Sequence, residues 1–127
     1  MHFKKLYIKQ TDRTPEIEFT FGKLRIWGTF VPVDAVAFYL PLIEWVKKYS
    51  NSPAPETIVD LGLTYIRGYA MSYIQKLLQE LISLNNEEHQ VIINWHFSAN
   101  SIDVEAGEYL SKKLYHLFNF VEVEEIL

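Results

Sequence analysis

The sequence contains no cysteine, and this absence excludes several kinds of site at once. A disulfide framework, a thiolate nucleophile and a cysteine-based zinc site all need cysteine side chains. Long hydrophobic runs are missing too, since the longest apolar stretch falls far short of the ~20 residues of a membrane-spanning helix. The first residues also lack the apolar core of a signal peptide. We therefore expect a soluble, cytoplasmic protein without disulfides or a membrane segment.

An excess of basic residues is absent as well. The chain has 12 Lys and Arg against 16 Asp and Glu, and its lysines occur as scattered pairs. Nucleic-acid binding needs a basic stripe that neutralises phosphates, so we expect no nucleic-acid partner. The sequence also has no Walker loop, no GxGxxG motif and no histidines at metal-ligand spacing. We therefore expect no cofactor and no metal.

The chain does have enough apolar residues for a substantial core. It is 127 residues long, 49% hydrophobic and 15% aromatic, which suits a folded domain. No repeat or linker divides it, so we expect a single domain over residues 1–127.

Periodicity of the apolar residues predicts alternating strands and helices in the order β-β-β-α-β-α-β-α-β. Asp34 is a candidate N-cap for the first helix. Pro41 is expected either to kink that helix or to mark its true first turn. The pattern predicts strands at residues 5–9, 16–21, 24–27, 57–66, 91–97 and 118–123, and helices at residues 34–49, 69–84 and 103–116.

The later strands have one apolar and one half-polar face. In residues 57–66, Val59, Leu61, Leu63 and Tyr65 alternate with polar or small residues. A sheet covered by helices on both faces would be apolar on both. We therefore predict an α/β fold (mixed α+β) with a mixed sheet and helices packed mainly on one face.

His96 is the histidine that most invites a catalytic interpretation. It lies on the half-polar side of its strand, and Asp103 or Glu105 could pair with it. The simpler interpretations are a partly exposed sheet histidine and carboxylates that complement a helix N-terminus. No nucleophile, metal site or phosphate loop accompanies these residues, so we expect no enzyme activity and no catalytic residue.

Two stretches of the chain resemble the SiaC family of small bacterial regulatory phosphoproteins. They are TPEIEFTFGKLRIWGTFVPVDAVAFYLPLIEWVKKY (14–49) and VIINWHFSANSIDVEAGEYLSKKL (91–114). The resemblance extends over residues 11–125 in the same order. The residues that carry it are Thr14, Pro15, Gly22, Leu24, Ile26, Gly28, Pro32, Phe38, Tyr39, Pro41 and Trp45, followed by Trp95, Asp103, Glu105, Gly107 and Glu108.

This resemblance implies a SpoIIAA-like (STAS-like) single-domain fold and a role in signalling. In the family, a kinase phosphorylates one threonine, a phosphatase removes the phosphate, and the unmodified form binds and activates a diguanylate cyclase. The threonine lies in an N-T-S-S-S-K-like stretch at the start of a helix. By resemblance, the partners of this chain would be a diguanylate cyclase and a kinase and phosphatase pair.

The family's phosphothreonine falls on Gly68, which has no hydroxyl. A phosphate there would add roughly −1.5 to −2 charge beside a helix N-terminus. Glycine cannot carry it, so the resemblance indicates a divergent member that is not phosphorylated at this position. The other interpretation of Gly68 is a positive-φ turn between strand and helix.

Several hypotheses remain open from the sequence. The first is a non-enzymatic binding module whose partner surface comprises Arg67, Gly68, Tyr69 and Ser72, with Arg67 available to a carboxylate or phosphate. The second keeps the phosphorylation switch but displaces the acceptor to Ser72. A third is a structural homo-oligomer formed through the half-polar sheet face around Trp27.

Overall fold

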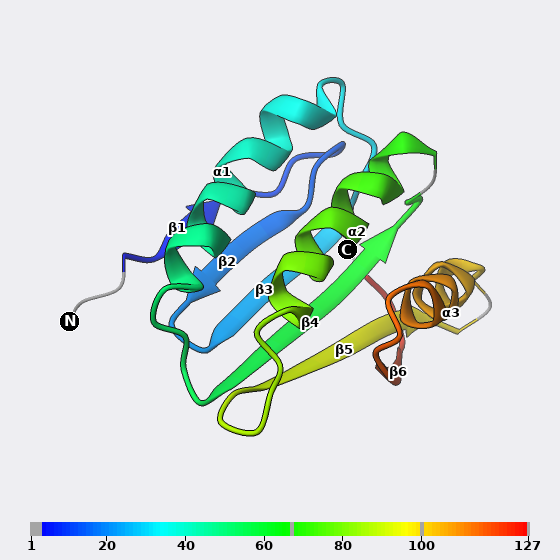
Figure 1. Cartoon of the computed structure of the whole chain (residues 1–127). Coiled ribbons are helices and arrows are strands. Elements are labelled where there is room, and N and C mark those ends of the chain that lie inside the picture. The colour runs from blue at the N-terminus through cyan, green and yellow to red at the C-terminus, as the bar shows by residue number, and fades with distance from the viewer. Residues whose placement is uncertain (1–3, 67, 100, 127) are drawn as a thin grey trace.

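The computed structural model describes residues 4–66, 68–99 and 101–126, which contain six strands and three helices. They follow one another in the order that the sequence predicts (Figure 1). The strands are β1 (Leu6–Ile8), β2 (Glu16–Thr20), β3 (Lys23–Thr29), β4 (Glu56–Thr64), β5 (Gln90–Ser98) and β6 (Asn119–Val123), and the helices are α1 (Ala35–Tyr49), α2 (Tyr69–Ile82) and α3 (Asp103–Lys113).

The strands form one sheet whose spatial order is the order of the chain, β1-β2-β3-β4-β5-β6. The pairs from β1 to β3 are antiparallel, and those from β3 to β6 are parallel. Connections between parallel neighbours are right-handed in nearly all proteins, so successive connections that move the same way place their helices on one face. Figure 1 shows α1 and α2 side by side in front of the sheet, and α3 in front of its β5–β6 end. The predicted mixed sheet with helices on one face is confirmed.

The core lies between this face and the helices. Strand register aligns its side chains in rows: Ile17 lies opposite Ile26, and Val59 lies between Leu24 and Ile93. All five are buried, because alternation along each strand places them on the helix side. The helices contribute buried residues at helical spacing, among them Leu42, Val46 and Tyr49 of α1, Ile74, Leu77 and Leu81 of α2, and Leu110 of α3.

Helix α1 begins where its sequence predicts. The Asp34 side chain accepts a hydrogen bond of 3.1 Å from the backbone N–H of Ala37, so Asp34 is the N-cap. Pro41 lies inside the helix and does not mark its first turn, so that alternative is wrong. The buried stripe on the sheet side holds α1 together despite the N–H that Pro41 lacks, since most helical stability comes from packing.

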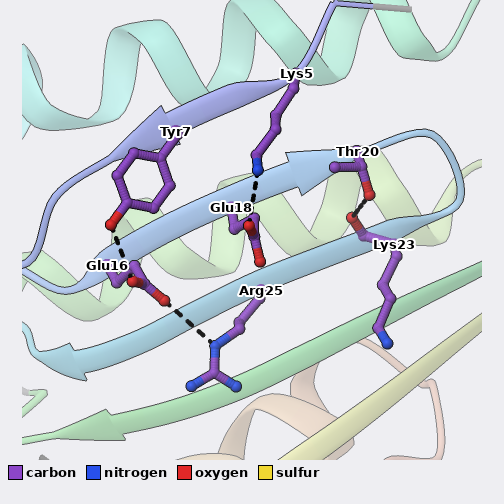
Figure 2. A network of polar contacts seen from close by, with 7 residues as sticks. All are labelled: Lys5, Tyr7, Glu16, Glu18, Thr20, Lys23 and Arg25. Carbon is purple, nitrogen blue, oxygen red and sulfur yellow. Dashed lines mark hydrogen bonds and ion pairs between the residues drawn. The ribbon is translucent and has the colours of Figure 1, made fainter.

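The face of the sheet away from the helices is half-polar, as predicted. Figure 2 views this face, with the helices behind the strands. Lys5 Nζ lies 2.9 Å from Glu18 Oε2, and Arg25 Nε lies 3.5 Å from Glu16 Oε1. Such cross-strand pairs let a sheet face water. One row of this face crosses all six strands and consists of Tyr7, Glu18, Arg25, Asp60, Asn94 and Asn119.

Candidate functional site

Strand β4 ends in a backbone conformation that turns one tyrosine outward. Tyr65 has φ 61°, a left-handed conformation that is uncommon for a bulky residue. The strand stops at Thr64 instead of residue 66, and the Tyr65 side chain is 60% exposed. The prediction that Tyr65 shares the buried face with Leu63 is therefore wrong. The left-handed turn interrupts the alternation that would have placed it there.

Gly68 occupies the N-cap position of α2, with φ 65° and ψ −144°. Essentially only glycine adopts this conformation, so Gly68 makes the positive-φ turn that one interpretation of the sequence predicts. A Cβ here would meet no atom within 4 Å, so backbone conformation, and not lack of space, favours glycine. Arg67, the neighbouring candidate for partner binding, lies outside the described residues.

The first turn of α2 presents Tyr69 and Ser72 on its outward side. Both side chains are exposed, and Ser72 Oγ donates a hydrogen bond of 2.6 Å to the carbonyl of Tyr69. In the described part of this junction, no side chain caps the helix and no acidic residue lies in its first turn. A helix N-terminus carries partial positive charge and suits a carboxylate or a phosphate. The two candidates from the sequence are thus together on one accessible surface.

A groove of about 1150 Å³ opens where β3, β4 and β5 end. Parallel strands have their carboxyl ends at one edge of the sheet, and ligand sites gather at that edge. Tyr65, Ile66 and Met71 line the groove from the β4–α2 junction. Its other walls come from the loop at residues 10–12, the start of α3 and residues 125–126. The groove therefore lies beside the start of α2 and is lined by segments that are far apart in the chain.

The charged side chains that line this groove are acidic. Asp12, Asp103, Glu105 and Glu125 all contribute, and the described lining contains no lysine, arginine or histidine. Clefts lined by one sign of charge attract groups of the opposite sign. The sequence drew attention to Asp103 and Glu105 but not to Asp12 or Glu125. Those two lie more than 100 positions apart in the chain, and no local pattern signals that they line the same groove.

Trp95 fixes the start of α3 beside the groove. Its indole Nε1 donates a hydrogen bond of 3.0 Å to the backbone carbonyl of Asp103. The ring is fully buried and packs against Gly107, one turn farther along the helix. Asp103 and Glu105 consequently lie in the first turn of α3, where their charges complement the helix N-terminus. This agrees with the simpler of the two interpretations of these carboxylates.

His96 faces the other side of the sheet. Its Nδ1 lies 3.1 Å from the carbonyl oxygen of Leu61, and its ring centroid lies 5.0 Å from that of Trp27. A carbonyl only accepts hydrogen bonds, so Nδ1 carries the proton in this contact. Asp103 and Glu105 belong to a helix on the opposite face. The structure therefore does not bring together the base and carboxylate that the enzyme hypothesis requires.

The groove carboxylates come from three separate segments of the chain. Within residues 4–66, 68–99 and 101–126, no three His, Cys, Asp or Glu side chains lie close enough together to hold a metal ion. Each helix in the same ranges is too short or too polar to cross a membrane.

Comparisons with known proteins agree with the resemblance seen in the sequence. The sequence model of the SiaC family regulatory phosphoproteins matches residues 8–123. Curated protein sequences give no significant match. SiaC of Pseudomonas aeruginosa has a similar structure, with a TM-score of 0.80 and 22% identity over 93% of this chain and 96% of that chain.

Two further structures from the same organism are similar. One is the crystal structure of diguanylate cyclase SiaD in complex with its activator SiaC, with a TM-score of 0.84 and 21% identity over 93% of this chain and 99% of that chain. The other is apo-SiaC, with a TM-score of 0.80 and 21% identity over 94% and 98% of the two chains. Identities this low show a shared fold, whereas the family model matches the sequence itself over most of its length. The chain belongs to the SiaC family of regulatory phosphoproteins.

Proposed function

We propose that this chain is a non-enzymatic regulatory module that binds a cytoplasmic signalling enzyme and controls its activity. The partner class we propose is a diguanylate cyclase. One of the structures similar to this chain is a complex of the diguanylate cyclase SiaD with its activator SiaC. The observation that carries the proposal is the groove at the ends of β3, β4 and β5. Exposed aromatic, apolar and carboxylate side chains meet there, beside the start of α2.

The partner surface would combine this groove with the outward side of the first turn of α2. Exposed tyrosines are enriched at protein interfaces, and Tyr65 and Tyr69 both lie at this junction. The left-handed backbone of Tyr65 is a conformation that recurs at functional sites, where the surrounding structure maintains it. We include in this surface the residues that the sequence suggested, Gly68, Tyr69 and Ser72, together with Arg67, which lies outside the described residues.

The charges of this surface define the chemistry of the partner segment. Asp103 and Glu105 favour a partner with lysine or arginine side chains, and Ile102 and Met71 favour apolar groups beside them. Arg67 would add an ion pair in which this chain supplies the cation and the partner supplies a carboxylate or phosphate. A mixed basic and apolar segment, such as one face of an amphipathic helix, satisfies these requirements.

A module without an acceptor at position 68 would bind constitutively. Phosphate at the family position would add negative charge next to an acidic groove and at the start of a helix. Gly68 offers no hydroxyl for that reaction. Binding would then depend on the amounts of the two proteins and not on a kinase acting at this position.

Calorimetric titration with a diguanylate cyclase from the same organism tests this function, together with the rate of cyclic-di-GMP formation. Tyr69→Ala and Glu105→Lys should each weaken binding by about tenfold or more, as truncation at a central contact typically does. Tyr7→Ala removes another exposed tyrosine from β1, outside the groove, and should leave affinity unchanged. If no cyclase binds, or if Tyr69→Ala and Glu105→Lys both bind normally, the proposal is wrong.

One observation favours a second candidate, a phosphorylation switch displaced to Ser72. Its hydroxyl is exposed in the first turn of α2, close to backbone N–H groups that no side chain of the described junction caps. A phosphate would be stabilised there by the helix N-terminus. Phosphopeptide mapping of residues 57–81 from native cells tests this. A modified Ser72, with loss of cyclase binding in Ser72→Asp and not in Ser72→Ala, would establish it, and an unmodified segment would remove it.

A further inference from the structure

The two edges of the sheet differ in how well they are protected from further strand pairing. An edge strand exposes unpaired backbone N–H and C=O groups, and proteins shield such edges with short strands and charged residues, lysine above all. β1 has both protections: it is three residues long and lies between Lys5 and Lys9. β6 is five residues long, contains no lysine or proline, and carries one charged side chain, Glu122.

Exposed apolar residues accumulate next to this unprotected edge. Tyr115 and Leu117, in the turn before β6, are 96% and 90% exposed. On the strand itself, Phe120 and Val121 are also exposed. Tyr115 has φ 51°, at a helix end where glycine is usual. A large apolar side chain in a strained conformation, held in solvent, indicates a surface that is covered by a partner.

The helix end that holds Tyr115 outward is well defined. The N–H of Tyr115 donates to the carbonyl of Lys112 at 3.2 Å, and the N–H of His116 donates to that of Ser111 at 3.2 Å. These two bonds form a Schellman motif, which normally closes a helix with glycine in the left-handed position. The position of the tyrosine is therefore set by the backbone and not by packing of its ring.

A hollow of about 620 Å³ lies on the helix side of this edge. Phe120 reaches it because it shares the face of its neighbour Trp95, and Glu122 points to the same side as Phe97. Neither Lys112 nor Glu122 forms an ion pair with another described residue. The hollow is lined by Glu108, Ser111, Lys112, Tyr115, His116, Leu117 and Phe120.

Charge is distributed unevenly along the edge. The end of α3, next to the beginning of β6, carries Lys112 and Lys113, while Glu122 and Glu124 lie at the other end of the strand. Glu108 lies one turn farther back along α3. Such a strip complements a second copy of itself turned end for end, because each basic end then meets an acidic end.

We propose that β6 is a dimerisation edge, on which a second copy of this chain adds its own β6 in antiparallel orientation. The two sheets then continue as one. A two-fold axis through Val121 places Phe120 opposite Glu122 of the second copy, and that carboxylate reaches the hollow that contains Lys112. The parallel alternative would bring like charges together at both ends, which opposes it. The interface uses none of the groove residues, so it does not depend on the function proposed above.

Sedimentation velocity of the whole chain, from low to high micromolar concentration, tests the dimer. The unmodified chain should shift from monomer towards dimer as concentration rises. Val121→Lys places two ammonium groups across the axis and should raise the dimer dissociation constant by about tenfold or more. Glu122→Lys should weaken the dimer similarly, since it places a cation beside Lys112 of the other copy.

The double variant Lys112→Glu with Glu122→Lys separates this arrangement from other dimers. It restores opposite charges at both ends and should recover most of the dimerisation that Glu122→Lys loses. Glu44→Lys, on the exposed side of α1, is the matched control and should not change association. Circular dichroism would verify that each variant is folded. A chain that stays monomeric, a dimer indifferent to Val121→Lys, or a double variant without recovery would each overturn the proposal.

Discussion

The indole ring of Trp95 lies so close to Gly107 that a Cβ on this glycine would be 2.6 Å from three of the ring atoms. Both residues belong to the stretch 91–114, in which β5 is followed by α3. The contact explains why that stretch needs a tryptophan on the strand and a glycine on the helix. The large ring fills the space between the two elements only if the helix has no side chain at the point of contact.

Gly107→Ala should therefore destabilise the protein by about 1–3 kcal/mol, because the added methyl group has to displace a fully buried ring. Urea unfolding would measure the change as a lower midpoint with an unchanged slope. Glu108→Ala, at the adjacent exposed position, should stay within about 0.5 kcal/mol. Equal stabilities of the two variants would mean that α3 can move away from Trp95 without cost.

Introducing a threonine at position 68 should be costly although there is room for its Cβ. Gly68→Thr forces a β-branched residue into φ 65° and ψ −144°, which we expect to cost about 1–3 kcal/mol of the free energy of unfolding. Thermal or urea unfolding would show the loss, with Ser72→Ala as a nearly neutral comparison in the same turn. A Gly68→Thr protein as stable as the unmodified chain would show that the junction readily adopts another conformation.

A buried hydroxyl joins the end of α1 to the start of β4. Tyr49 Oη lies 2.6 Å from Oγ1 of Thr57 and accepts a hydrogen bond of 3.1 Å from the N–H of Ala54. Tyr49→Phe deprives both groups of this partner in the interior and should cost about 1–3 kcal/mol. The same change at the exposed Tyr7, whose hydroxyl donates to Glu16 at 3.2 Å, should cost far less. Chemical denaturation of the two variants in parallel measures the difference.

The pair Lys5–Glu18 should be visible in a pH titration (Figure 2). A hydrogen bond from Lys5, together with its charge, lowers the pKa of Glu18 below its ordinary value. A lowered pKa in the folded state means that the pair stabilises the protein above the unfolded-state pKa of Glu18. That contribution disappears as the pH falls through the folded-state pKa.

Carboxyl NMR titration of Lys5→Met should find the pKa of Glu18 closer to its ordinary value. Added salt should have the same effect on the unmodified chain, because both side chains are well exposed and salt screens such pairs. Lys9→Met is the control and should leave the pKa of Glu18 where it is. An unchanged pKa in Lys5→Met would contradict the assignment of the shift to this pair.

Local patterns were sufficient for most of the fold. Alternation along residues 16–20 and 57–64 and the N-cap at Asp34 indicated which segments form strands and helices and which side of the sheet is covered. The pattern failed at Tyr65, where an apolar residue continues the alternation but the backbone turns left-handed. It was ambiguous at Pro41, since burial of the rest of α1 compensates for a residue that usually interrupts a helix.

The candidate site was less accessible from sequence. Tyr69 and Ser72 could be placed at the start of α2 because the strand-to-helix junction is local. The groove is lined by residues more than 100 positions apart in the chain, such as Asp12 and Glu125. Spacing along the chain carries no information about such a meeting, which is determined by how the whole sheet assembles.

Because the strands lie side by side in the order of synthesis, each new strand that leaves the ribosome finds its partner already in place. No strand has to wait for a distant segment, because each strand from β2 onward pairs with the strand before it. Among the elements of this sheet and its helices, the last unit to emerge is α3 with β6. It brings two of the acidic side chains of the groove and the unprotected edge. A nascent chain can therefore build most of its sheet before it presents the acidic start of α3 or the unprotected edge, so the order of the strands delays binding at both.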